Sequence, residues 1–155
     1  MDLDDVFLQA AGKTAIHRTG PSRPVRVLHE MKLLKGRILD FGSGHGADVR
    51  WMQDQGLEAT GYDPVHGPYD QPKGRFATVL CTYVLNTLPV DKESWLIEDL
   101  FRFKRKNGCI YVTVRRDIDQ GGWTKKGTFQ RQVELHAPIV FTSPAFIIYR
   151  IVSNW

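Results

Sequence analysis

Through the middle of the chain, short apolar stretches typical of strands alternate with segments whose apolar residues recur at the spacing of a helix. In the helix-period segments, apolar residues recur at three- or four-residue spacing, as Val49 and Met52 do before Gly56. Strands that alternate with helices predict a mostly parallel sheet with helices on its faces. The predicted strands of this sheet are residues 38–41, 58–62, 76–82 and 109–114.

Two further segments carry the helical period. The first begins near Ser22, a capping residue followed by Pro24 in the first turn, and ends at Gly36. The second runs from Asp91 or Lys92 to Lys106, with acidic residues early and basic residues late, and ends at Asn107-Gly108. The apolar residues expected to face the core are Val27, Leu28, Met31 and Leu34 on the first helix and Leu96, Leu100 and Phe103 on the second.

Three segments do not follow this alternation of strands and helices: the N-terminus, an internal loop and the C-terminal part of the chain. The first 20 residues are predicted to form an arm, and residues 64–75, with three prolines and two glycines, a loop. Beyond Arg116, a loop rich in Gly and Lys leads to two strands, 128–135 and 146–152, predicted to pair antiparallel with each other. No repeat or domain boundary interrupts the pattern, so residues 1–155 are predicted to be one α/β domain.

Composition narrows the class of protein. A hydrophobic fraction of 42% with 25% charged residues is ordinary for a globular domain. No apolar run approaches the ~18 residues of a membrane span, and the acidic N-terminus is unlike a signal peptide. Cys81 and Cys109 lie in apolar runs, which indicates buried thiols rather than a metal site. We therefore expect a soluble, cytoplasmic protein without a metal.

The most informative segment is Arg37–Gly46, which combines a strand, an acid at its tip and glycines at every second position. Gly42, Gly44 and Gly46 can shape a turn whose amides face a ligand. The first two also fit a dinucleotide pattern, with Asp63 at the offset of an acid that binds a ribose diol. Asp40, however, would repel a pyrophosphate and attract an ammonium or sulfonium group. This acid favours S-adenosylmethionine as the ligand.

With Asp40, Gly42, Gly44 and Gly46 matching a first motif, and Asp63 a ribose-binding acid, the sequence resembles class I S-adenosylmethionine-dependent methyltransferases. The segment 77–88 resembles their fourth-strand region. The resemblance implies a Rossmann-like methyltransferase sheet, mostly parallel with an antiparallel C-terminal strand pair. Its third strand is expected to be short or missing, because little room is left between Pro64 and Phe76. A narrower resemblance is to methyltransferases found with bacterial DNA phosphorothioation systems, in segments 14–18, 22–26, 48–50, 83–86 and 128–130.

Three further candidates follow the 76–82 strand, at the edge where open α/β sheets bind and react. Thr82 is predicted to contact the cofactor, and Tyr83 and Asn86 are the catalytic candidates. Ordinary structural explanations stand beside these roles. The glycines could form a tight turn without a ligand, Asp40 could cap that turn, Asp63 could initiate a turn and Asn86 could cap a helix.

Charge is the clue to the substrate. Lys and Arg outnumber Asp and Glu by 21 to 17, and residues 102–116 hold six basic residues and no acid. The predicted substrate-binding residues are Arg18, Arg26, Lys125 and Lys126. Such residues suit phosphates, which predicts a nucleic acid or nucleotide-like substrate, although a solvated basic face has the same composition. Two alternatives stay open: a small-metabolite methyltransferase, and a catalytically silent cofactor-binding module that works with a protein partner in a larger complex.

Overall fold

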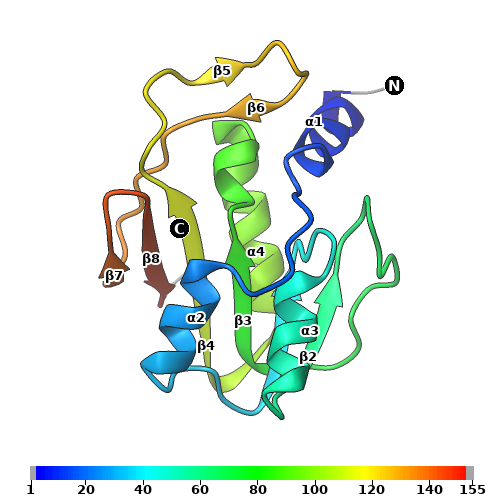
Figure 1. Ribbon diagram of the computed structural model, residues 1–155, viewed down its shortest axis with the longest axis vertical. Coiled ribbons are helices and arrows are strands. Elements are labelled where there is room, and N and C mark those ends of the chain that lie inside the picture. Colours follow the sequence, from blue (N-terminus) through cyan, green and yellow to red (C-terminus); the bar gives the residue numbers. More distant parts are fainter. Residues whose placement is uncertain (1–2, 153–155) are drawn as a thin grey trace.

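The computed structural model describes residues 3–152, and its centre is a six-stranded sheet in the order β2-β1-β3-β4-β8-β7. The strands β2, β1, β3 and β4 run parallel, whereas β8 is antiparallel to both β4 and β7 (Figure 1). Their bounds are β1 Arg37–Phe41, β2 Glu58–Tyr62, β3 Phe76–Thr82, β4 Lys104–Arg115, β7 Ile139–Thr142 and β8 Phe146–Ile151. The predicted fold class, mostly parallel with antiparallel C-terminal strands, is therefore confirmed.

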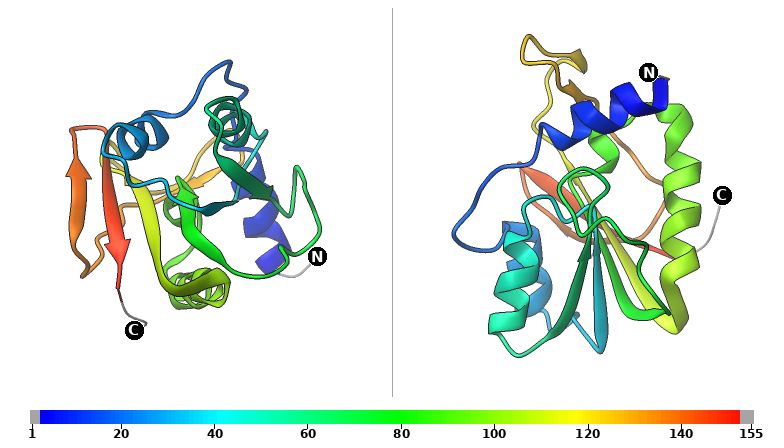
Figure 2. Two further views of the ribbon diagram at one scale, coloured as in Figure 1. Left: turned by 90° about the horizontal axis from the view of Figure 1, so that it is seen from below. Right: turned by 90° about the vertical axis from the view of Figure 1, so that its right-hand side faces the viewer.

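Helices cover both faces of the sheet. The helices α2 (Arg23–Glu30) and α3 (Ala47–Asp54) lie on one face, and α4 (Glu93–Phe103) lies on the other, while α1 (Leu3–Gly12) lies across the carboxyl end of the strands (Figure 2). Each face has its own apolar core. The α2–α3 core includes Val25, Leu28 and Met52, and the α4 core includes Leu96, Ile97, Leu100 and Phe103. Burial of these side chains stabilises the layered arrangement.

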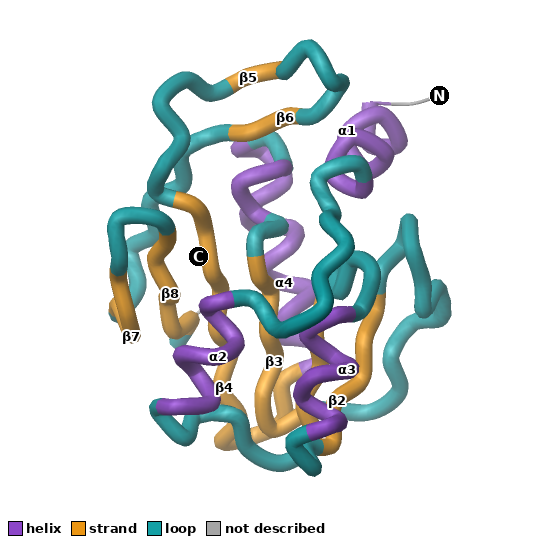
Figure 3. Tube along the Cα trace, viewed as in Figure 1, coloured by secondary structure: helices purple, strands orange, loops and turns teal. Residues whose placement is uncertain are grey.

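The N-terminal segment differs from the expected arm, because it contains the helix α1. This helix packs on a short hairpin of β5 (Gly122–Trp123) and β6 (Phe129–Gln130), where the Phe7 ring lies 5.2 Å from Trp123 and 5.4 Å from Phe129. Residues 13–22, here called the strap, then connect α1 to α2 without regular secondary structure (Figure 3). The N-terminal segment and the loop after Arg116 thus pack against each other and belong to the folded domain.

The helix predicted to start at Ser22 begins there but is shorter than expected. Ser22 is the N-cap, and its side chain accepts a hydrogen bond from the Val25 backbone N–H. The helix ends at Glu30, since Lys32 has φ of 60° and the Leu33 N–H bonds back to the Leu28 carbonyl. Met31, predicted to be in the core, is 45% exposed as a result.

The prediction that Asn107-Gly108 ends a helix is wrong. The helix α4 ends at Phe103, and β4 starts at once with Lys104 beside Phe76. Asn107 (φ 63°) and Gly108 form a bulge, because the pairing moves from Lys104 to Cys109 while β3 advances only from Phe76 to Thr78. A Cβ on Gly108 would lie 2.9 Å from the Phe76 carbonyl oxygen, so this strand position requires glycine.

The predicted pairing of strands 128–135 and 146–152 is also wrong. Only Phe129–Gln130 is extended in the first segment, and it pairs with Gly122–Trp123, whereas β8 pairs with β4 and with Ile139–Thr142. Arg131 explains the difference. Its backbone N–H donates to the Asn86 carbonyl and its guanidinium donates to Glu93 at 2.9 Å, which pins this segment to the start of α4 instead of the sheet.

Residues 63–75 contain no helix or strand, which agrees with a third strand that is missing. Within residues 3–152, no helix combines the length and the apolar character that crossing a membrane requires.

Candidate active site

A cavity of about 670 Å³ lies at the carboxyl ends of β1, β2 and β3. Its floor includes Asp40, Asp63 and Thr82, each at or just after the end of one of these strands. The helix α1 and the strap form the other side, through residues such as Leu8 and Ile16. Figure 2 shows α1 across this end of the sheet. Parallel strands end at one edge, so residues far apart in sequence meet there.

The glycine loop after β1 is built by hydrogen bonds to β2. Gly42 and Ser43 donate backbone N–H bonds to the Tyr62 carbonyl, and Gly44 donates to the Asp63 carboxylate at 2.7 Å. Gly42, Gly44 and Gly46 all have positive φ, at 81°, 55° and 82°. A Cβ on Gly42 would lie 2.5 Å from Val84 Cγ2. The turn therefore requires glycine at position 42 even without a ligand, in agreement with the tight-turn explanation given above.

Three carboxylates surround the floor of the cavity. Asp40 is 3% exposed; burial raises its pKa well above the usual range, the charges of Asp48 and Asp63 raise it further, and Arg18 opposes them. Asp48 accepts hydrogen bonds from the Ser22 backbone N–H and hydroxyl, and Arg18 lies 3.5 Å from it. No hydrogen bond to the Asp40 side chain occurs among the described residues. This buried, unbonded carboxylate is suited to a cationic ligand.

Asp63 has a structural task that fits the turn-initiator explanation. One carboxylate oxygen accepts from Gly44, and the other accepts from the backbone N–H groups of Val65 and His66 at 2.8 and 2.9 Å. Asp63 also lines the cavity. An ionised carboxylate has about four acceptor positions, so one position is left to accept from a ribose hydroxyl while these three bonds persist.

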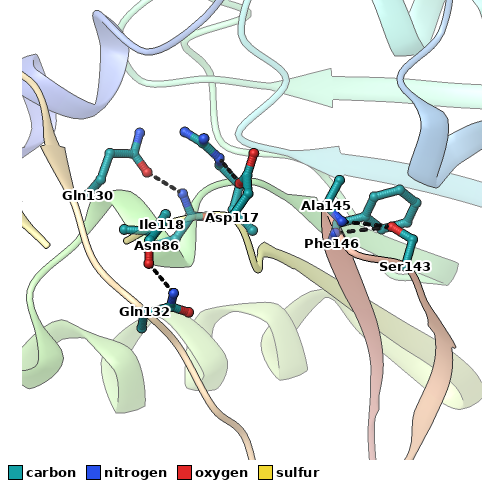
Figure 4. A network of polar contacts seen from close by, with 9 residues as sticks. Asn86, Asp117, Ile118, Gln130, Gln132, Ser143, Ala145 and Phe146 are labelled. Carbon is teal, nitrogen blue, oxygen red and sulfur yellow. Dashed lines mark hydrogen bonds and ion pairs between the residues drawn. The ribbon is translucent and has the colours of Figure 1, made fainter. Parts of the chain in front are cut away.

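Tyr83 and Asn86, the catalytic candidates, both line the cavity. Tyr83 has φ of 61°, a conformation that costs a non-glycine residue about 1–3 kcal/mol, and burial raises the pKa of its phenol. Asn86 lies within η1 (Leu85–Thr87) and does not cap a helix: its side-chain N–H donates to Gln130 Oε1 at 2.7 Å (Figure 4). The Asn86 Oδ1 atom is buried and has no hydrogen-bond partner among the described residues. An unpaired acceptor beside a cavity is a place for a ligand donor.

The sequence matches the methyltransferase-domain family over residues 14–143, which is most of the chain. The chain belongs to this methyltransferase family. Membership confirms the predicted enzyme class, and with it S-adenosylmethionine as the cofactor that this class uses. A comparison with curated protein sequences found no match.

The fold is also that of solved methyltransferases. One is the 1,6-didemethyltoxoflavin-N1-methyltransferase of Burkholderia thailandensis, at a TM-score of 0.63 and 16% identity, with 83% of this chain and 76% of that chain covered. A second is the magnesium protoporphyrin IX methyltransferase of Synechocystis PCC 6803, at 0.51 and 16%, covering 96% and 80%. A third is the glycopeptide N-methyltransferase MtfA with bound S-adenosylmethionine, at 0.51 and 12%, covering 90% and 69%. The narrower resemblance to phosphorothioation-associated enzymes gains no support from these matches.

The predicted substrate-binding residues of this methyltransferase are not brought together. Arg18 lines the cavity, where it is half-buried against Asp48. Arg26 is exposed on α2, and Lys125 and Lys126 are exposed in the turn between β5 and β6. These three do not line the cavity. The predicted cofactor-binding residue Gly46 does not line it either. Their roles stay predictions.

Beside the cavity lies a histidine cluster that the sequence did not indicate, and of its three members His45 lines the cavity. His17 of the strap stacks on His45 of the glycine loop with 3.7 Å between ring centroids, and His45 lies 4.3 Å from His66. His66 Nε2 lies 2.7 Å from the Gly12 carbonyl oxygen at the end of α1. Partial burial lowers the pKa of His45, and His17 and His66 lower it further. Nothing at positions 17, 45 and 66 signals this contact, because three separate loops supply the rings.

Proposed function

We propose that this chain transfers a methyl group from S-adenosylmethionine to a small-molecule acceptor that binds in the cavity described above. The observation that carries the proposal is the cavity itself, about 670 Å³ in volume and bounded by α1 and the strap. That volume lies in the range of sites for small ligands and cofactors. Of the four basic residues predicted to bind a polyanionic substrate, only Arg18 lines the cavity, and it is paired with Asp48.

The residues at the cavity floor fit the cofactor. S-adenosylmethionine supplies, when bound, a methyl group on a positively charged sulfur. Asp40 provides the buried negative charge that such a cation requires, and Asp48 and Asp63 add to the negative potential. Asp63 has one acceptor position left for a ribose hydroxyl, and Thr82 lies on the floor between β1 and β4. Methyl transfer needs little more than an in-line approach, so positioning is the main task of these residues.

The acceptor side of the cavity favours a substrate with a hydrogen-bond donor. The unpaired Asn86 Oδ1 can accept a bond from an N–H or O–H group, and its amide is held in orientation by Gln130. Tyr83 also lines the cavity, and burial raises the pKa of its phenol further above neutral pH. Two of the similar structures are named as N-methyltransferases, one of 1,6-didemethyltoxoflavin and one of a glycopeptide, which supports a nitrogen acceptor.

A labelling experiment tests the proposal. The purified protein is incubated with tritiated-methyl S-adenosylmethionine and, separately, the metabolite, DNA and RNA fractions of a lysate. We expect label in the metabolite fraction, reduced by Asn86→Leu, with the cofactor affinity unchanged in calorimetry. Label in DNA or RNA would favour the nucleic-acid substrate. Binding of S-adenosylhomocysteine without transfer to any fraction would favour the silent module.

A further inference from the structure

The amino ends of the strands, at the edge opposite the cavity, carry a dense set of basic residues. Hydrogen bonds from guanidinium groups to backbone carbonyls bring them together. The Arg37 guanidinium donates to the carbonyls of Lys73 and Arg75, and the Arg75 guanidinium donates to the carbonyl of Lys104. A Cβ on Gly36 would lie 4.0 Å from the Arg105 guanidinium. We call the set the amino-edge basic surface; its members are Lys35, Arg37, Lys73, Arg75, Arg102, Lys104, Arg105 and Lys106.

This surface is far from electrically balanced. Within residues 3–152, two of its members form ion pairs, Arg37 with Glu58 at 3.5 Å and Arg102 with Asp99 at 3.2 Å. Lys35, Lys73, Arg105 and Lys106 are exposed, and none has an ion pair among the described residues. Like charges held close together repel one another, so an anion that spans them is attracted more strongly than by separate lysines.

The basic residues are spread along one edge of the sheet. The surface follows the starts of β1, β3 and β4, which are neighbours in the sheet. Adjacent strands lie roughly 4.8 Å apart, so the three starts extend over about 10 Å, before the side chains extend the row further. A row of charges matches a polymer with regularly spaced anionic groups better than one compact anion.

The chemistry of the surface distinguishes nucleic acid from an acidic protein. None of the exposed large apolar residues described in the structure belongs to segments 35–37, 73–75 or 102–106. A specific protein interface has an apolar or aromatic centre, which this surface lacks. Phosphate contacts need only cations and place no demand on base stacking, so they carry little sequence preference.

We propose that the amino-edge basic surface binds the phosphate backbone of nucleic acid, while the cavity at the opposite edge remains free for a small molecule. The nucleic acid is then a partner and not the methyl acceptor. The proposal goes beyond the proposed function, and either can fail without the other.

Fluorescence anisotropy with a labelled 20-base-pair DNA duplex tests this surface over a series of KCl concentrations. The test variant is Lys35→Gln/Lys73→Gln/Arg105→Gln/Lys106→Gln, in which every replaced residue is exposed. We expect affinity to fall by about tenfold or more at low salt. The slope of log K against log[KCl] should flatten by about 3–4, since each phosphate contact contributes roughly 0.9.

The matched control removes four positive charges from other surfaces: Lys13→Gln/Arg26→Gln/Lys125→Gln/Lys126→Gln. It should bind DNA nearly as the parent does. An equal loss in the control, no binding of DNA at 50 mM KCl, or tighter binding of poly-glutamate than of the duplex would each overturn the proposal. Calorimetry with S-adenosylhomocysteine checks that both variants are folded. If the quadruple variant does not fold, the two double variants Lys35→Gln/Lys73→Gln and Arg105→Gln/Lys106→Gln replace it, with half the change in slope expected for each.

Discussion

The two edges of the sheet differ in the sign of their charge and in how that charge meets water. At the carboxyl edge, Asp40, Asp48 and Asp63 are buried around the cavity. At the amino edge, the basic residues are mostly exposed and a few are paired. Buried charges interact strongly and select a ligand, whereas exposed charges are screened by salt and attract without selecting. One sheet thus has a selective edge and an unselective edge.

The largest effect in the comparison should come from Asp63→Ala. This change removes three backbone hydrogen bonds and the acceptor expected for the ribose, so cofactor affinity should fall by about 1–3 kcal/mol, with loss of stability as well. Calorimetry with S-adenosylmethionine measures the first effect and thermal unfolding the second. Unchanged affinity with lowered stability would reduce Asp63 to a turn residue.

Asp40→Asn should raise the stability of the protein at neutral pH while it weakens the binding of S-adenosylmethionine. The raised pKa of Asp40 means that the folded state holds its proton more tightly than the unfolded state, so this residue favours folding at acid pH. That contribution is lost as pH rises from the unfolded pKa through the folded one. At neutral pH the variant should therefore be more stable than the parent, by roughly 2–4 °C in Tm for each kcal/mol regained.

The same variant should bind S-adenosylmethionine less well, because the cation loses its buried counter-charge. Binding of uncharged-sulfur S-adenosylhomocysteine should change less. In the parent, affinity for the cation should increase with pH through the raised pKa of Asp40. A variant that keeps both the pH dependence and the preference for the cation would contradict the role given to Asp40.

The smallest effect should come from the amino edge. Glu58→Gln removes the carboxylate that pairs with Arg37, in a pair where both side chains are largely exposed. Such pairs contribute at most about 1 kcal/mol, so the Tm should change little and cofactor affinity not at all. Thermal unfolding at low and high salt measures this. A large loss of stability, equal to that of Asp63→Ala, would remove the contrast between the edges.

The sequence predicted those parts of the molecule in which local signals agree with the fold. Ser22 and Pro24 indicated the start of α2, and the Arg37–Gly46 segment indicated the strand, the loop and the acid at the cavity floor. Asn107-Gly108 misled because the same dipeptide that ends helices also permits a bulge with positive φ. Val133 and Leu135 alternate as a strand does, yet Arg131 binds their segment to η1 and α4.

The rest of the site depends on contacts between distant segments, which no local pattern encodes. Gln130 reaches Asn86 across 44 positions, and His17, His45 and His66 meet from three loops. The hidden helix α1 belongs to the same group, since its packing partners Trp123 and Phe129 lie more than a hundred residues later. Only the assembled fold brings these side chains together.

Gly42 has a consequence for the way such domains diverge. Any side chain at this position would collide with Val84, so the glycine would be retained by a descendant that had stopped transferring methyl groups. Asp40, in contrast, would be lost readily by such a descendant, because burial of its carboxylate is unfavourable unless a cation binds. In a set of descendants, glycines at 42 would trace common ancestry, while replacement of the acid at 40 would mark lineages that have abandoned the reaction.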